Sequence, residues 1–282
     1  MGLRFGFRIY ANWIHWPRML ALRSLMLILL SPSKTLSFED APPAEDSTLP
    51  AFLEASEKLM AKLKRLSAKK VEGLMSVNPS IAAQTVEWAS SWNTPFTAAN
   101  ARPAAHCFKG AVYTGLQART WSDADRAFAQ RHLRILSGLY GVLTPLDLMQ
   151  PYRLEMGLKW AITSKTPNLY TFWGDRIQQR IEADAHGLII NLASTEYSKA
   201  AIAKSYTGRV ITPAFKELVG TEYKAKMAYA KEARGTMARH IVQNQWTNPE
   251  DLKQFTGMGY AYDPNLSSAD DWVFTRDSLT SK

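Results

Sequence analysis

Cysteine is almost absent from this chain of 282 residues, with Cys107 the only one. A single thiol excludes an internal disulfide and favours a reducing compartment. Long apolar runs are also missing: none reaches the roughly 20 residues that a membrane-spanning helix needs. We therefore expect a soluble protein that has no membrane partner.

Metal-binding motifs are missing as well. The sequence has no C-x-x-C or H-x-x-x-H pattern, and its five histidines are scattered singly. His106 and Cys107 are neighbours, but adjacent residues seldom chelate one ion. We therefore predict no metal site and no cofactor, and we interpret Cys107 as a buried structural residue.

Positive charge is in moderate excess, with a formal net charge of +9. Residues 1–25 contribute four arginines and no acid, which leaves +5 for residues 26–282. That balance is compatible with anionic partners but does not establish one. We expect residues 1–25 to be an extension from an upstream start and the working domain to cover 26–282. A targeting segment is the alternative, because such segments also avoid acids.

Apolar patterning predicts strands and helices in mixed order. Buried strands are expected at 26–30, 133–136, 187–192, 210–214 and 272–275, and helices at 49–66, 68–76, 80–91, 169–185 and 228–246. The order shows no regular βαβ rhythm and no repeat. The sequence therefore indicates a single compact α/β domain.

The first motif that carries chemistry is Ser31-Pro-Ser-Lys34, which matches the S-x-x-K pattern of serine acyl enzymes. Their partner motifs S-D-N and K-T-G are absent, and Pro32 favours a loop over the helical turn that such enzymes need. We instead predict a loop at a strand end whose residues Ser31, Ser33, Lys34 and Thr35 face an anion. A polar turn with a solvated lysine is the alternative.

A second motif, Cys107–Leu116, contains Lys109 and Tyr113, which would share a face if the segment is helical. A third, Leu136–Asp147, contains Gly138 and Gly141. It is similar to the hairpin of a helix-hairpin-helix element, whose backbone amides hold DNA phosphates. Such hairpins usually separate their glycines by one residue, and here two intervene. A strand-to-loop turn is the competing interpretation.

Basic residues add a fourth feature. Lys231 and Arg234 are three apart on a predicted helix and share a face. Arg153 offers a guanidinium suited to a phosphate or carboxylate. Each is individually typical of a solvated surface, but together they would line a basic cleft.

Several of these stretches resemble the YaaA family of bacterial peroxide stress resistance proteins. They are MLILLSPSKTL, FKGAVYTGL, HLRILSGLYGVLTPLDLMQPYRLEMG, LYTFWGD, NLASTEYSK and KEARGTMAR. The resemblance runs from Met26 nearly to the end. It implies a cytoplasmic protein that acts during hydrogen peroxide stress, limits unincorporated iron and so limits oxidative damage. It also implies a compact α/β fold unlike the common superfolds, and DNA binding through a positively charged cleft and a helix-hairpin-helix element.

Three hypotheses follow. The first is a stress protein that binds double-stranded DNA without sequence specificity, through backbone phosphates and with steep salt dependence. The second is an enzyme for a small anionic substrate, with a pocket formed by Ser31, Lys34, Lys109, Tyr113, Arg153, Lys231 and Arg234. The third is a scaffold in which these residues stabilise turns. Convergence in one concave pocket would favour the enzyme.

Overall fold

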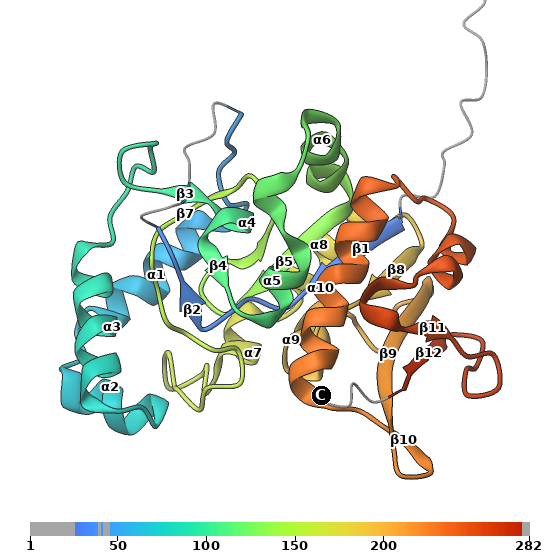
Figure 1. Ribbon diagram of the computed structural model, residues 1–282. Helices are drawn as coiled ribbons and strands as arrows, with labels where there is room; N and C mark the ends of the chain where they lie inside the picture. The colour runs from blue at the N-terminus through green and yellow to red at the C-terminus, as the bar shows by residue number, and fades with distance from the viewer. Residues whose placement is uncertain (1–25, 39–40, 42–45, 278–282) are drawn as a thin grey trace, which may run out of the picture.

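The computed structural model describes residues 26–38, 41 and 46–277. The predicted extension at 1–25 therefore lies outside the described residues. The elements run from the first strand, which is blue in Figure 1, to the last, which is red. Within the described part of the chain, no helix is both long and apolar enough to cross a bilayer.

One eight-stranded sheet forms the centre of the molecule, in the order β11-β12-β9-β8-β1-β5-β6, with β10 paired to β9. The five inner strands are parallel, and β6, β10 and β11 are antiparallel to their neighbours. The strands of this sheet are β1 (Met26–Leu30), β5 (Leu133–Ser137), β6 (Gly141–Leu143), β8 (Leu188–Asn191), β9 (Arg209–Val219), β10 (Glu222–Lys224), β11 (Ala261–Tyr262) and β12 (Asp271–Arg276). Two small ribbons, β2 (Thr35–Leu36) with β4 (Phe108–Lys109) and β3 (Arg102–Pro103) with β7 (Leu148–Met149), lie outside it.

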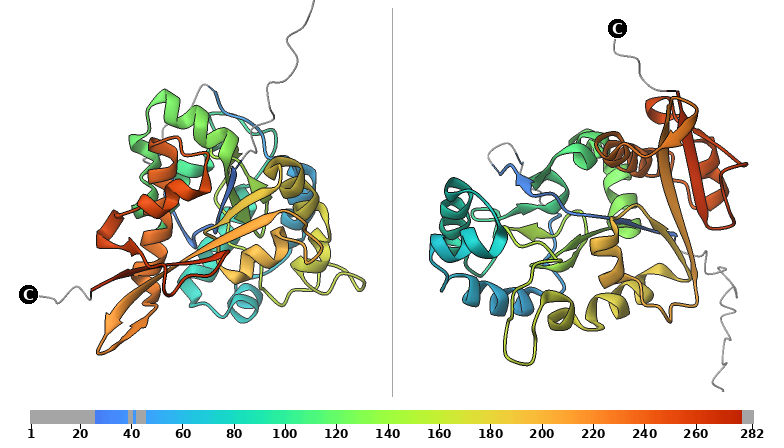
Figure 2. Two further views of the ribbon diagram at one scale, coloured as in Figure 1. Left: turned by 90° about the vertical axis from the view of Figure 1, so that its right-hand side faces the viewer. Right: turned by 90° about the horizontal axis from the view of Figure 1, so that it is seen from below.

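Helices cover both faces of the sheet. Figure 2 shows α5, α6 and α10 on one face and α8 and α9 on the other. The α-helices are α1 (Leu53–Leu63), α2 (Ala68–Met75), α3 (Pro79–Ser91), α4 (Ala104–Cys107), α5 (Ala111–Leu116), α6 (Asp123–His132), α7 (Leu169–Trp173), α8 (Arg176–Ala185), α9 (Thr195–Ala201) and α10 (Met227–Gln243). Short 3-10 helices occupy Ala118–Thr120, Pro249–Gln254 and Gly257–Gly259.

The burial patterns of the central strands agree with their positions in the sheet. All five residues of β1 are fully buried, as expected for a parallel strand covered on both faces. Along β9, by contrast, buried residues alternate with more exposed ones, so only one side of that strand is fully covered. The α/β fold class predicted from the sequence is confirmed, as are the five predicted strands.

Two predictions about elements need correction. The helix expected at 169–185 is two helices, α7 and α8, because Gly174 has a positive φ of 50° between them. A helix-hairpin-helix at 133–147 is wrong, because this stretch is an antiparallel hairpin of strands in which Ser137 pairs with Gly141. The competing interpretation, a strand followed by a turn, is the one that the structure has.

Candidate functional site

The carboxyl ends of β1 and β8 meet at one edge of the sheet, and the candidate site is built there. The two strands are parallel, with Leu29 opposite Asn191. Ser31 follows β1 directly. Its Oγ accepts a hydrogen bond of 2.8 Å from the Ser194 backbone N–H and donates to Ser194 Oγ over 3.2 Å. This edge is where open α/β sheets bind ligands.

A cavity of about 450 Å³ opens at this edge, within the size range of small-molecule sites. It collects residues from the β1 loop, the start of α5, the β8–α9 loop and α10. They are Ser31, Pro32, Ser33, Lys34, Gly110, Ala111, Val112, Tyr113, Leu192, Ser194, Ala228, Lys231 and Arg234. None of these lining residues is acidic, so the cavity has a net positive wall. The structure thus brings together six predicted site residues: Ser31, Ser33, Lys34, Tyr113, Lys231 and Arg234.

Two glycines allow α10 to pack closely against α5, and this packing places Lys231 and Arg234 at the cavity wall. A Cβ at Gly235 would overlap the Val112 carbonyl oxygen, and one at Gly115 would overlap the Glu232 carbonyl oxygen. The two helices therefore pack backbone against backbone, with no side chain between them at these points. Lys231 and Arg234, on the turn of α10 before Gly235, reach the cavity as a result.

Arg234 is half-buried, and no acidic side chain among the described residues pairs with it. Burial alone lowers the pKa of its guanidinium, and no acid compensates for that burial within the described residues. An anion in the cavity would supply the missing negative charge. Lys231, which is exposed at the cavity rim, adds a second positive charge.

Tyr113 forms a neutral part of the wall. Its hydroxyl donates to the Ser31 carbonyl oxygen over 3.0 Å, and its ring stacks on Phe108 with 5.1 Å between centroids. Burial raises the pKa of Tyr113 well above its ordinary value, and the nearby Tyr152 and Tyr197 raise it further. The phenol is therefore protonated and serves as a hydrogen-bond donor rather than a base.

The loop that carries Ser33 and Lys34 is held on two sides. Thr35 pairs with Lys109 in the small β2–β4 ribbon. Gly110, with a φ of 108°, lies so close that an added Cβ would be 2.9 Å from Ser33 Oγ. A side chain at position 110 would thus be strained and would press on the loop.

Lys34 is directed at an acid rather than at Ser31. Its Nζ lies 3.3 Å from Glu155 Oε1, and Arg153 Nη2 lies 3.2 Å from the same oxygen. The one-turn Ser–Lys geometry of a serine acyl enzyme is therefore not formed, in agreement with the loop predicted here. Arg153 lines a smaller recess next to the cavity rather than the cavity itself.

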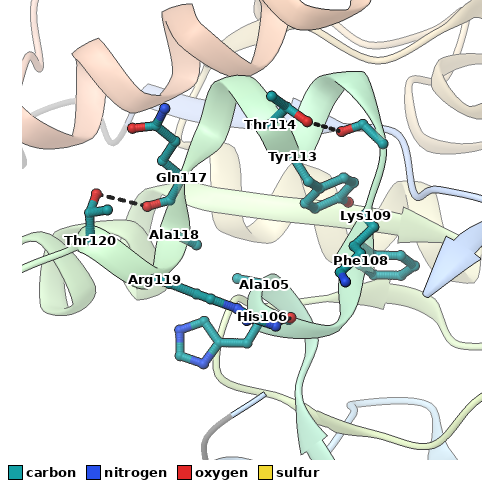
Figure 3. Close-up of a pocket in the computed structure, with 11 residues that line it drawn as sticks. Ala105, His106, Phe108, Lys109, Tyr113, Thr114, Gln117, Ala118, Arg119 and Thr120 are labelled. Atoms are coloured by element: carbon teal, nitrogen blue, oxygen red, sulfur yellow. Dashed lines mark hydrogen bonds between the residues drawn. The ribbon is translucent and has the colours of Figure 1, made fainter. Parts of the chain in front are cut away.

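Three predicted residues lie elsewhere. Lys109 belongs to β4, so its helical alignment with Tyr113 is wrong, and it lines a second cavity of about 400 Å³. Figure 3 shows it beside Phe108, just before α5. Gly138 and Gly141 are buried in the β5–β6 hairpin. A Cβ on Gly138 would overlap the Leu154 carbonyl oxygen, and one on Gly141 would crowd Trp173, so this hairpin has no open face for a phosphate.

Cys107 is buried, as predicted. Burial raises the pKa of its thiol, an effect that Arg102 and Arg119 only partly oppose. Such a thiol is a poor nucleophile and metal ligand. In the described part of the chain, no three His, Cys, Asp or Glu side chains gather in a way that would hold a metal ion.

Sequence reasoning missed Glu155, Ser194, Tyr152 and Tyr197. The sequence could have pointed to Glu155, because it lies two residues after Arg153, which was already a candidate site residue. Ser194 had none, because its contact with Ser31 joins positions 163 residues apart.

Comparison with known proteins identifies the family of this chain. A family model described as peroxide stress protein YaaA matches residues 26–266. A UPF0246 protein of Hahella chejuensis is 46% identical over 256 residues, which cover 89% of this chain and 100% of that protein. A UPF0246 protein of Cellvibrio japonicus is 44% identical over 256 residues, with 89% and 99% covered. The resemblance that the motifs indicated is confirmed: the chain belongs to the peroxide stress protein YaaA family.

Proposed function

We propose that this peroxide-stress protein is an enzyme that binds a small phosphorylated or carboxylated molecule in the cavity between the β1 loop and α10. The observation that carries the proposal is the convergence of Ser33, Lys34, Lys231 and Arg234, from two distant parts of the chain, on one concave surface. A scaffold would not need an unpaired, half-buried Arg234.

The site offers a specific division of roles. Arg234 and Lys231 bind the anionic group, and Arg234 can do so through two parallel hydrogen bonds. Ser33 adds a hydroxyl, and Lys34 at the rim can turn from Glu155 to the ligand, because its side chain is 66% exposed. Limitation of iron and of oxidative damage, which the family resemblance implies, would follow from the reaction at this site.

Double-stranded DNA is a second candidate for the same cations. The exposed rim residues Lys34 and Lys231 favour it, because a backbone phosphate could reach them without entering the cavity. The β5–β6 hairpin speaks against it, because its residues are buried and its two glycines pack closely against Leu154 and Trp173. A small anion accounts for the half-buried Arg234, and a duplex accounts only for the rim.

Calorimetric titration with inorganic phosphate and with short phosphonates tests the proposal. Arg234→Met keeps the length of the side chain and removes its charge. We expect it to weaken phosphate binding roughly 10-fold or more, since a hydrogen bond to a charged group contributes about 1.5–3 kcal/mol. Arg65→Met is the matched control, because Arg65 is exposed after α1 and lies outside the cavity. Equal losses in both variants would refute a specific site.

A salt series with a short duplex separates the two candidates. Binding to DNA that weakens steeply with salt and depends on Lys34→Ala, but not on Arg234→Met, would assign the rim to DNA. Binding of phosphonates that depends on Arg234, without duplex binding at low salt, would leave the small anion as the ligand. Arg153→Ala belongs in the same series, because the sequence predicted that Arg153 contributes to anion binding.

A further inference from the structure

The wall of the anion cavity combines cations with hydrocarbon. Its apolar residues come from four segments: Pro32 from the β1 loop, Ala111 and Val112 from α5, Leu192 directly after β8, and Ala228 from α10. All of them except Leu192 are at least partly exposed, so a ligand can reach them. A molecule whose anionic group is held by the cations therefore meets carbon on much of the remaining wall.

The neutral polar groups of this wall are already engaged. Ser31 Oγ accepts a hydrogen bond from the Ser194 N–H, and Ser194 Oγ accepts one from Ser31. Ser33 Oγ accepts from the Thr35 N–H over 3.2 Å. The Tyr113 hydroxyl is used as a donor to the Ser31 carbonyl oxygen. Since none of the described lining residues is acidic, the wall is rich in donors and poor in acceptors.

An anion alone does not fill this space. A volume of about 450 Å³ corresponds to roughly 15 groups of the size of water, and a phosphate supplies about five of them. Hydroxyl, amine or amide groups on the rest of the ligand would bring donors that find few acceptors here. A buried donor without a partner keeps its desolvation cost. Hydrocarbon avoids this cost and displaces water that an apolar wall holds poorly.

We propose that the ligand is an amphiphilic anion, in which a phosphate or carboxylate is attached to a hydrocarbon body without hydrogen-bond donors. The inference rests on the proposed function and narrows its substrate class. The anionic group binds Arg234 and Lys231, and the hydrocarbon lies against Val112 and Ala228. Sugar phosphates, amino acids and nucleotides are disfavoured, because their bodies are rich in donors.

A series of alkylphosphonates from methyl to hexyl tests the inference on the full-length protein by calorimetry. Affinity should rise about fourfold for each added methylene until the cavity is filled, which is the ratio that burial of one CH2 gives. In 3-hydroxypropylphosphonate a hydroxyl replaces the terminal methyl of butylphosphonate, and this probe should bind about tenfold more weakly. Butyltrimethylammonium, which has the same chain and a cationic head, should not bind.

Val112→Thr tests the wall itself. Threonine has nearly the shape of valine but places a hydroxyl among the carbons, so the ratio of butyl to methyl affinity should fall. Val86→Thr is the matched control, because Val86 is half-buried in α3 and lies outside the cavity, and it should leave this ratio unchanged. Arg234→Met should weaken all members of the series by about the same factor, because it removes the partner of their common head.

The outcomes separate the inference from the proposed function. Equal affinities along the series, or a hydroxyl analogue that binds as well as butylphosphonate, would overturn the inference alone if Arg234→Met still weakens binding. Failure of every phosphonate, and of the carboxylates of the same lengths, would overturn both. A gain with chain length that is accompanied by no effect of Arg234→Met would place the hydrocarbon outside this cavity and also overturn both. Circular dichroism of each variant establishes that a changed ratio does not come from a lost fold.

Discussion

Gly235 and Val112 are in backbone contact: a Cβ on Gly235 would overlap the Val112 carbonyl oxygen. This contact joins α10 to α5 and fixes how far Lys231 and Arg234 stand from the wall that Tyr113 forms. The geometry of the cavity therefore depends on a residue that has no side chain.

Gly235→Ala should destabilise the protein by about 1–3 kcal/mol or more, because the methyl group must push two packed helices apart. Gly73→Ala is the matched control. Gly73 lies inside α2 with nothing within 4 Å of an added Cβ, so alanine there should stabilise the protein by about 0.5–1 kcal/mol. Urea unfolding measures both. A neutral Gly235→Ala would contradict the close packing of these helices.

Ser31→Ala should cost about 1–3 kcal/mol, because it leaves the partly buried Ser194 N–H without its acceptor. The hydroxyl of Ser90 is exposed and bonds only to the Val86 carbonyl of its own helix. Ser90→Ala should therefore change the free energy of unfolding by less than about 0.5 kcal/mol. If the two variants were equally stable, Ser31 would not tie the ends of β1 and β8 together.

Stability at low pH should depend on Glu217, which is buried opposite Arg276 in the β9–β12 pair. Burial by itself would raise the pKa of Glu217, but hydrogen bonds and charge from Arg276 and Lys226 outweigh it, so the pKa lies below 4.5. The ionised carboxylate therefore stabilises the fold above about pH 4.5, and this contribution is lost as the pH falls below that value.

Glu217→Gln gives the test. At neutral pH the variant should be less stable by about 3–5 kcal/mol, because Arg276 loses its buried partner. The difference from the unmodified protein should narrow as the pH falls below 4.5. A difference that stays constant from neutral pH down to pH 3 would show that folding does not lower the pKa of Glu217.

Cys107 should resist thiol reagents and hydrogen peroxide in the native protein, because it is fully buried and its pKa is raised. Titration with Ellman's reagent should report no rapidly reacting thiol until a denaturant is added, and one thiol afterwards. Rapid labelling of the native protein would mean that the thiol is accessible, and would reopen a redox role for it.

Local patterns were enough to predict much of the fold. A fully apolar run predicted β1, and apolar runs of similar length predicted β5 and β8. The position of the Ser31–Lys34 loop followed from the same logic, because residues directly after a buried strand lie at the end of that strand in the sheet. Lys231 and Arg234 followed from helical spacing alone.

Long-range pairing set the limit of this reasoning. No local pattern places Ser194 against Ser31, or the β1 loop against Glu155. The glycines at 138 and 141 misled for a related reason: they satisfy close packing against Leu154 and Trp173, and sequence alone does not show what approaches a glycine. Lys109 was misplaced because the β2–β4 ribbon is decided by its partner strand.

The position of β1 also governs how the chain must be made. This first described strand lies in the interior of the sheet, and its Met26 pairs with Leu188, about 160 residues later. At a synthesis rate of ~5–20 residues per second, β1 leaves the ribosome about 10–30 s before β8. The fully apolar β1 therefore has no partner strand on its β8 side until about 160 further residues have been translated. Pairing of β1 on both sides is thus delayed until β8 has been made, and this early exposure makes β1 a natural target for chaperones.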